Sequence, residues 1–217
     1  EIVPNTDGTR VLDLACGSGL LLKILYDRNK NFRLKGVDMC PEELALAKAR
    51  LPNGVVDLFE LKAQNLTAID DNSIDVVLCH WALTLMKPIT PVLNEVNRVL
   101  SSGGRFVALV DGPMNAAPKY SDVHNLIYQF VQAKLPKYGE IDLGDPRIRS
   151  TDRSKNLLHE AFPDAKVNIE TSVVFMEGPV TEVAETAAGF FYASFILPPE
   201  TRRIMLSELS NLLAISK

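Results

Sequence analysis

The chain has 217 residues, of which 47% are hydrophobic and 23% are charged, and its formal net charge at pH 7 is −4. This composition supplies enough apolar material for a sizeable core and excludes a disordered chain. The sequence contains no dense basic run and no stretch of about 20 apolar residues, so we expect neither a nucleic acid partner nor a membrane span.

The chain contains three cysteines, Cys16, Cys40 and Cys79, which are far apart and form no C-x-x-C motif. Their odd number and spacing argue against a disulfide framework and against a zinc knuckle, and we predict no metal site. No signal peptide opens the sequence, and we predict a cytoplasmic location. The sequence begins without Met, close to its first strand, which leaves open whether a leading segment precedes it.

Strands and helices alternate over the first half of the chain. In chain order, we predict a strand at 11–15, a helix at 20–28, a strand at 32–37, a helix at 41–50, a strand at 55–61, a polar connection at 65–72, a strand at 74–79, a helix at 91–100, a turn at 101–104 and a strand at 105–110. The strands are continuous apolar runs, which is typical of strands buried on both faces. This order predicts a doubly wound, mostly parallel, Rossmann-like α/β sheet with right-handed crossovers.

The alternation ends after Val110. The later elements that we predict are a helix at 120–135, a loop-rich stretch at 136–152, a helix at 154–161, a long strand at 166–176 and closing helices at 179–196 and 199–213. We predict one domain over residues 1–217. Its cofactor-binding core spans about 9–110, a helical lid is inserted at about 112–152, and the closing helices and last strand span about 154–217.

Two glycines, Gly17 and Gly19, follow the first predicted strand and precede a helix. Parallel sheets bind ligands at such strand ends, where glycine lets a ligand approach the main chain and the helix offers free N–H groups. A dinucleotide-binding fingerprint needs a third glycine, where this chain has Leu22. A phosphate-binding P-loop needs Lys followed by Ser or Thr, where it has Leu20 and Leu21.

Two acids accompany this turn, and no basic residue lies within it. Asp38, at the end of the second strand, is placed to accept hydrogen bonds from both hydroxyls of a ribose. Asp13, within the first strand, suits a ligand with a positive charge. S-adenosylmethionine combines a free ribose with an ammonium and a sulfonium. The residues also allow a plain strand–helix turn, Asp38 as an acid at a helix N-terminus, and Asp13 bonded to backbone amides.

Four segments in order, VLDLACGSG, GVDMCPEELALAKAR, DNSIDVVLCHWAL and EVNRVLSSGGRFVALV, resemble class I S-adenosylmethionine-dependent methyltransferases. The resemblance is to the group that includes the ubiquinone/menaquinone-biosynthesis enzymes and other small-molecule methyltransferases. It covers roughly residues 9–110, and the remainder of the chain matches only loosely.

The resemblance implies a set of cofactor-binding residues. Asp13 and the main chain at 15–19 would hold the amino-acid end, Asp38 would hold the ribose, and Met39 would pack on the adenine. Gln64 and Asn65 would meet the adenine edge or would be ordinary loop residues. The full set is Asp13, Ala15, Cys16, Gly17, Gly19, Asp38, Met39, Gln64, Asn65, Cys79 and His80.

The sequence departs from the family pattern at two of these positions: Ala15 replaces the commoner first glycine, and Gln64 replaces an acid. Cys79 and His80 end the fourth strand, where a main-chain carbonyl of the family faces the cofactor ammonium. We favour this main-chain role for His80 over that of a general base.

No catalytic residue is assigned from the sequence. The candidates for a general base are His80 and His124, where His124 would reach from the lid or would lie on the surface. Trp81 would form a wall beside the methyl group. The candidate substrate contacts are Trp81, Tyr128, Arg147 and Arg149, and the two arginines are either an anion clamp or solvated.

The predicted function is methyl transfer from S-adenosylmethionine to an O, N or C nucleophile of a small molecule by in-line displacement, with S-adenosylhomocysteine as the product. The alternatives are a catalytically silent S-adenosylmethionine-binding module or sensor, a nicotinamide-dependent dehydrogenase, and a protein or RNA methyltransferase. The acidic charge balance disfavours RNA. The oligomeric state stays open between a monomer and a homodimer.

Overall fold

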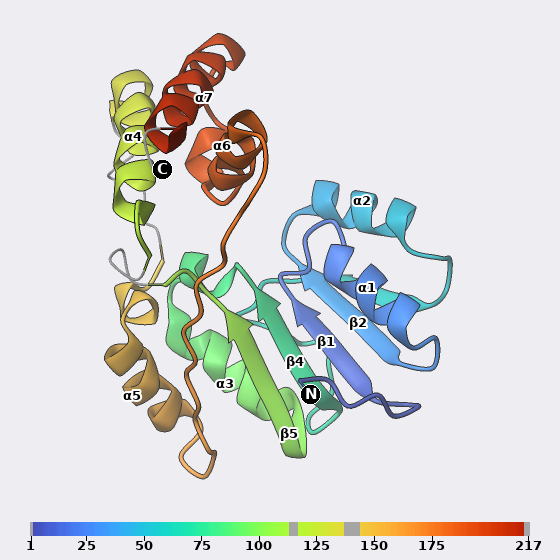
Figure 1. Ribbon diagram of the computed structural model, residues 1–217. Helices are drawn as coiled ribbons and strands as arrows, with labels where there is room; N and C mark the ends of the chain where they lie inside the picture. Colours follow the sequence, from blue (N-terminus) through green and yellow to red (C-terminus); the bar gives the residue numbers. More distant parts are fainter. Residues whose placement is uncertain (1, 113–116, 137–143, 215–217) are drawn as a thin grey trace. The chain divides into compact units, whose positions relative to one another are not determined.

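The computed structural model describes residues 2–112, 117–136 and 144–214 (Figure 1). Contacts between Cα atoms divide the chain into two compact units, Glu1–Asp111 with Leu143–Ile169 and Gly112–Asp142 with Glu170–Lys217, and each is described by itself. The helices and strands are β1 (Arg10–Leu14), α1 (Leu20–Arg28), β2 (Arg33–Asp38), α2 (Pro41–Arg50), β3 (Val56–Glu60), β4 (Ile74–His80), α3 (Ile89–Val99), β5 (Leu100–Leu109), α4 (Tyr120–Lys134), α5 (Thr151–Ala161), α6 (Val180–Gly189) and α7 (Pro199–Ala214).

The first unit is built on a five-stranded sheet in the order β3-β2-β1-β4-β5. All four strand pairs are parallel, which confirms the predicted α/β class. The strand order reverses between β1 and β4, so the chain leaves these neighbouring strands in opposite directions. The carboxyl ends of the two strands therefore border the crevice in which open α/β sheets bind ligands.

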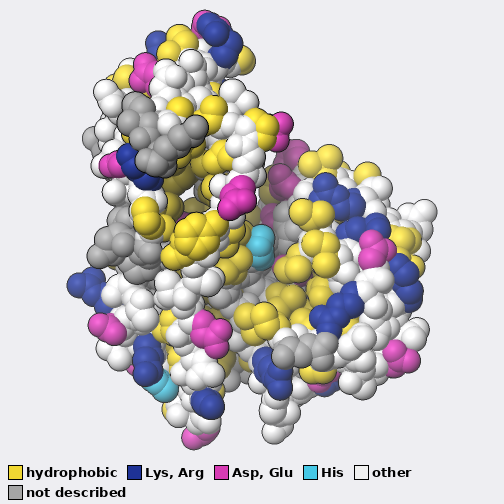
Figure 2. Space-filling view, in the orientation of Figure 1, with side chains coloured by type: hydrophobic (Ala, Val, Ile, Leu, Met, Phe, Trp, Pro, Cys, Tyr) yellow, Lys and Arg dark blue, Asp and Glu magenta, His cyan; other side chains and the backbone are white. Residues whose placement is uncertain are grey.

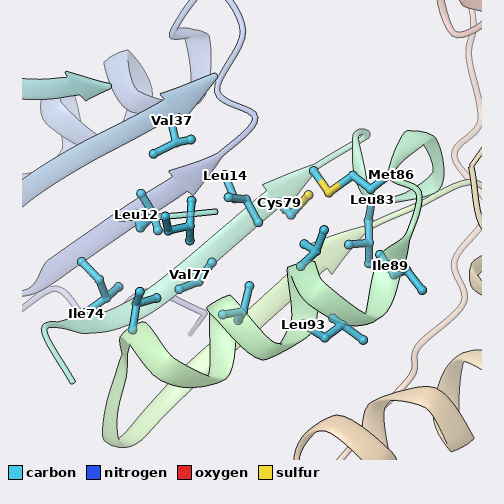
Figure 3. Packing of buried hydrophobic residues seen from close by; sticks show 14 of the residues in the cluster. Leu12, Leu14, Val37, Ile74, Val77, Cys79, Leu83, Met86, Ile89 and Leu93 are labelled. Carbon is cyan, nitrogen blue, oxygen red and sulfur yellow. The ribbon is translucent and has the colours of Figure 1, made fainter. Parts of the chain in front are cut away.

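Helices cover both faces of this sheet, because alternate strand residues point to opposite sides. On one face Leu12 and Val77 pack with the buried side of α3, including Ile89 and Leu93 (Figure 3). On the other face the strands pack against α1 and α2. The exposed hydrophobic side chains of α1 and α2 include Leu20, Ile24 and Leu46. Figure 2 shows hydrophobic side chains on the surface of this part of the molecule.

A glycine on β2 lets α1 approach the sheet closely. A Cβ built on Gly36 would lie 2.7 Å from Leu22 Cδ1 and 2.8 Å from Leu58 Cδ2. The large side chain of Leu22, which is fully buried, therefore fills the space that Gly36 leaves open. The close helix–strand contact that a dinucleotide fingerprint obtains from a third glycine on the helix is obtained here from a glycine on the neighbouring strand.

Most predicted elements are confirmed within a few residues, but two predictions are wrong. The predicted turn at 101–104 belongs to β5, which begins at Leu100 and shifts its register against β4 between Ile74 and Val76. The predicted strand at 166–176 forms no helix or strand, and every residue in it except Val167 is exposed. Its β-branched residues favour an extended chain, but a strand also needs a hydrogen-bonded partner, and none is present among the described residues.

The core of the second unit is formed by its helices α4, α6 and α7. Ile127 of α4 and Met205 and Leu209 of α7 are fully buried. The predicted helix at 179–196 is shorter in the structure: α6 ends at Gly189, and a 3₁₀ helix follows at Tyr192–Ser194. The predicted lid at about 112–152 falls partly on residues 113–116 and 137–143, which lie outside the described residues.

Within the described part of the chain, no helix is long and apolar enough to cross a membrane.

Candidate functional site

The turn between β1 and α1 contains three residues in the left-handed region of backbone conformation: Ala15 (φ 60°), Gly17 (φ 49°) and Gly19 (φ 73°). The amide of Cys16 donates to the carbonyl of Val37 at 2.9 Å, which ties the start of the turn to β2. A further left-handed residue, Trp81 (φ 59°), directly follows the neighbouring strand β4. Such a conformation is strained for a bulky side chain, and strained residues cluster at functional sites.

The two glycines of the turn are needed for different reasons. A Cβ on Gly19 would lie 2.9 Å from Ala47 Cβ, so this glycine lets α1 and α2 pack together. A Cβ on Gly17 would meet only Glu43 Oε2, at 3.6 Å, which is an ordinary contact. The described residues leave room for a Cβ beside Gly17, which would let a ligand lie against its main chain.

Asp38 joins the turn to α2. Its Oδ2 accepts from the amide of Gly17 at 2.8 Å, and its Oδ1 accepts from the amide of Cys40 at 2.9 Å. The second bond is the helix N-terminal role that the sequence left open. A carboxylate has about four acceptor positions, so two of them stay available for the hydroxyls of a ribose.

Asp13 is 1% exposed, and no hydrogen bond to its carboxylate is found among the described residues. The backbone amides that could have satisfied it therefore do not. Burial, together with the negative charge of Asp38, raises the pKa of Asp13 to about 7. A buried carboxylate without a partner needs a physical explanation, and a bound cation would supply one.

Two thiols lie beside Asp13. Burial raises the pKa of both Cys16 and Cys79 to about 12, and the charge of Asp13 contributes to each increase. Both side chains are therefore neutral at physiological pH. They add to the apolar surroundings of the carboxylate and bring no positive charge to it.

The remaining cofactor candidates of the first unit lie at or beyond the ends of β2, β3 and β4. Met39, directly after β2, is 65% exposed and offers an apolar surface. Gln64 and Asn65 lie in the connection between β3 and β4, where the Gln64 amide donates to the carbonyl of Lys87 at 3.5 Å. His80 ends β4 with its side chain exposed, and partial desolvation of the imidazole lowers the pKa of His80 below its usual range.

The two arginines have partners within the first unit. Arg147 forms an ion pair with Asp145, with its Nη2 2.8 Å from Oδ2 and its Nε 3.0 Å from Oδ1. Arg149 donates from Nη2 to the carbonyl of Thr84 at 3.3 Å. These bonds account for part of the hydrogen-bonding capacity of both guanidinium groups.

The other two candidates belong to the second unit. His124 and Tyr128 lie one turn apart on α4, and their rings stack with centroids 4.2 Å apart. Phe191 packs edge-on against His124 at 5.9 Å and stacks on Tyr120 at 5.8 Å. This aromatic cluster lies on one face of α4.

The sequence interpretation missed a residue that holds the glycine turn from outside. Nη1 of Arg50, at the end of α2, lies 2.7 Å from both the carbonyl and the hydroxyl oxygen of Ser18. Its place in the last turn of a helix suggested only an interaction with the helix dipole. Its partner is 32 residues away in sequence, and no local pattern identifies such a pair.

Substitutions at the two glycines should separate packing from ligand binding. We expect Gly19→Ala to lower the free energy of unfolding by about 2 kcal/mol, because the new Cβ meets Ala47 in a left-handed backbone. Gly17→Ala should cost only about 1 kcal/mol but should weaken S-adenosylhomocysteine binding more than Gly19→Ala does. Urea unfolding and titration calorimetry measure the two effects. Wild-type affinity in Gly17→Ala would contradict the open space beside Gly17.

The parallel five-stranded sheet with helices packed on both faces defines a Rossmann-like domain. Residues 12–108 match the family described as "Methyltransferase domain". Residues 12–108 thus form a methyltransferase domain of the class I S-adenosylmethionine-dependent kind, and the chain is similar to the group that includes the ubiquinone/menaquinone-biosynthesis enzymes, as the four segments predicted.

Two relatives and one solved structure illustrate this similarity. The chain is 29% identical to an uncharacterized methyltransferase of Schizosaccharomyces pombe, over 95% of this chain and 78% of that protein. It is 30% identical to a demethylmenaquinone methyltransferase of Thermus thermophilus, over 63% of this chain and 60% of that protein. A solved structure described as a methyltransferase from an antibiotic biosynthesis pathway of Anabaena variabilis matches 98% of this chain and 82% of its own, with a TM-score of 0.70 at 15% identity, and shows the shared fold.

Proposed function

We propose that this protein transfers a methyl group from S-adenosylmethionine to a nucleophilic atom of a small molecule. The observation that carries the proposal is Asp13, a buried carboxylate that accepts no hydrogen bond from the described residues and lies beside the glycine turn. An ammonium group placed there would compensate its charge. Family membership, together with a relative named as a demethylmenaquinone methyltransferase, supports a small-molecule acceptor.

The residues present fit the cofactor. Asp13 and the main chain at Gly17 would hold its amino-acid end, Asp38 its ribose, and Met39 one face of its adenine. When bound, S-adenosylmethionine supplies a methyl group that is already activated on a sulfonium. The task of the protein is then to align the acceptor and to exclude water, which in favourable cases lowers a barrier by about 7–11 kcal/mol.

We infer that residues 1–217 act as one methyltransferase domain and that the helical second unit selects the acceptor. Its aromatic cluster on α4, with His124 and Tyr128, could contact an apolar or planar acceptor. Trp81, Arg147 and Arg149 are further candidate contacts from the first unit. A cytoplasmic location remains a prediction that rests on the cysteine content.

Titration calorimetry and a turnover assay test this function. We expect S-adenosylhomocysteine and S-adenosylmethionine to bind and NAD not to bind, with methyl transfer to at least one member of a panel of phenols, hydroxyl compounds and carboxylic acids. Adenosyl binding without turnover across a broad panel would favour the silent module. NAD binding with no adenosyl affinity would overturn the proposal.

The role of His80 can be tested separately. Because we assign it a main-chain role, His80→Ala should retain S-adenosylhomocysteine affinity and keep kcat within about tenfold of wild type. A loss of kcat by a factor of about 10²–10⁴ with unchanged affinity would instead assign general-base catalysis to the imidazole. Desolvation lowers the pKa of His80, which favours the neutral imidazole that a general base requires. If the imidazole were the base, kcat would therefore fall as the pH drops and the ring becomes protonated.

A further inference from the structure

The connection between β3 and β4 carries both candidate adenine contacts, Gln64 and Asn65. It forms neither helix nor strand over residues 61–73, yet two of its side chains are fully buried: Leu66 is 0% exposed and Ile69 is 1% exposed. Irregular connections usually lie on the surface and move more than the elements that they join. Something outside the connection must therefore hold its main chain in place.

An ion pair on α3 holds it. The carboxylate of Glu95 accepts from the amide of Leu66 at 2.6 Å, and Arg98 donates to the carbonyl of Leu66 at 3.0 Å. Glu95 and Arg98 also bond each other, with Nε to Oε1 and Nη2 to Oε2 both at 2.9 Å. Both polar main-chain groups of Leu66 are thus bound by one charged pair, and charge-assisted hydrogen bonds are about twice as strong as neutral ones.

The same arginine also secures the far end of the connection. Nη1 of Arg98 donates to the carbonyl of Ile69 at 2.9 Å and to Asp71 Oδ1 at 2.5 Å, and the carbonyl of Arg98 accepts from the amide of Asn72 at 3.0 Å. The guanidinium group bonds five acceptor atoms at once, which is more than the three N–H donors of a lysine ammonium can bond. The side chains of Glu95 and Arg98 are only 20% and 30% exposed, so solvent weakens this network less than it weakens a surface pair.

The Gln64 amide is oriented by its bond to a carbonyl outside the connection. Its Nε2 donates to the carbonyl of Lys87, which leaves Oε1 as an acceptor. An acceptor is the group that suits the exocyclic amine of adenine. Hypoxanthine carries an oxygen at the same position and would be disfavoured, because that oxygen and Oε1 of Gln64 are both acceptors and cannot bond to each other.

We propose that Glu95 and Arg98 are positioning residues for adenine recognition, because they anchor the main chain at Leu66 and thereby place Gln64 and Asn65 at the ring edge. This inference rests on the proposed function. Neither residue is assigned a contact with the ligand, and both act through the connection that they hold.

The test compares S-adenosylhomocysteine with S-inosylhomocysteine by titration calorimetry on the whole chain. Wild type should prefer the adenosyl compound by about tenfold or more. Arg98→Met should lose about tenfold in affinity for S-adenosylhomocysteine and little for the inosyl compound, so that the preference largely disappears. Arg98→Lys should recover only part of it.

Arg10→Met is the matched control. Arg10 forms a comparable two-bond pair with Asp75, with Nε to Oδ2 at 3.0 Å and Nη2 to Oδ1 at 2.5 Å, at the amino end of β1. Its loss should lower the Tm but leave the ligand preference intact. If Arg98→Met does not fold, Glu95→Gln replaces it, with a smaller loss of preference expected.

Three results would overturn the inference while leaving cofactor binding established: a wild type without preference, a folded α3 variant with the wild-type preference, or an equal loss in Arg10→Met. A wild type that binds neither adenosyl compound would overturn the proposed function itself, and this inference with it.

Discussion

Replacing Asp38 with alanine should weaken S-adenosylhomocysteine binding by about 2–3 kcal/mol, which is roughly a 30- to 150-fold increase in Kd. The substitution removes the proposed acceptor for the ribose hydroxyls. It also removes the bonds from the amides of Gly17, at 2.8 Å, and Cys40, at 2.9 Å, so the turn loses its link to α2. Titration calorimetry at one pH and one salt concentration measures the change.

Asp57→Ala is a suitable control for Asp38→Ala. Asp57 is also an acid of the sheet, but its side chain is 70% exposed and its partner is Lys35. An exposed pair of this kind contributes little, so both the affinity and the stability should change by less than about 1 kcal/mol. A folded Asp38→Ala protein that binds S-adenosylhomocysteine as tightly as wild type would refute the ribose assignment.

Asp13→Asn should raise the stability of the ligand-free protein above pH 7 and should weaken S-adenosylhomocysteine binding. The pKa of Asp13 is raised from 3.8 to about 7 by burial and by Asp38. Between about pH 4 and pH 7 the folded protein therefore binds more protons at this site than the unfolded chain does. The free energy of unfolding falls as the pH rises through this window, and above it the destabilisation amounts to as much as about 4 kcal/mol.

Asparagine carries no charge and has no such pH-dependent term. Without ligand, Asp13→Asn should therefore be more stable than wild type at pH 8, by up to about 4 kcal/mol, and the difference should become small near pH 4.5. Urea unfolding at the two pH values measures both. The same variant should bind S-adenosylhomocysteine more weakly, because the carboxylate that compensates the ammonium is gone.

Wild-type stability and wild-type affinity in Asp13→Asn at pH 8 would together show that Asp13 is an ordinary core residue. A gain in stability with a loss of binding would instead identify a charge that is retained for function at the expense of stability, which is common at ligand sites.

The local sequence was sufficient to predict the alternating elements of the first unit and the turn that carries the candidate site. Strand and helix periodicities, Pro41 at the start of α2 and the two glycines after β1 are all short-range signals. Asp13 and Asp38 were identified because each lies in or at the end of an apolar strand, and parallel strands bring their carboxyl ends to the same edge.

Only the tertiary structure showed which partners these residues have. The lack of a hydrogen bond from any described residue to Asp13, the different needs for Gly17 and Gly19, and the anchoring of Leu66 by α3 all depend on groups that are distant in sequence. The exposed segment at 166–176 shows that strand-forming residues are not enough: they favour a strand, but no described residues pair with them. Periodicity reports which side of an element is buried, whereas charge compensation, strand pairing and close backbone contacts are decided by residues that only folding brings together.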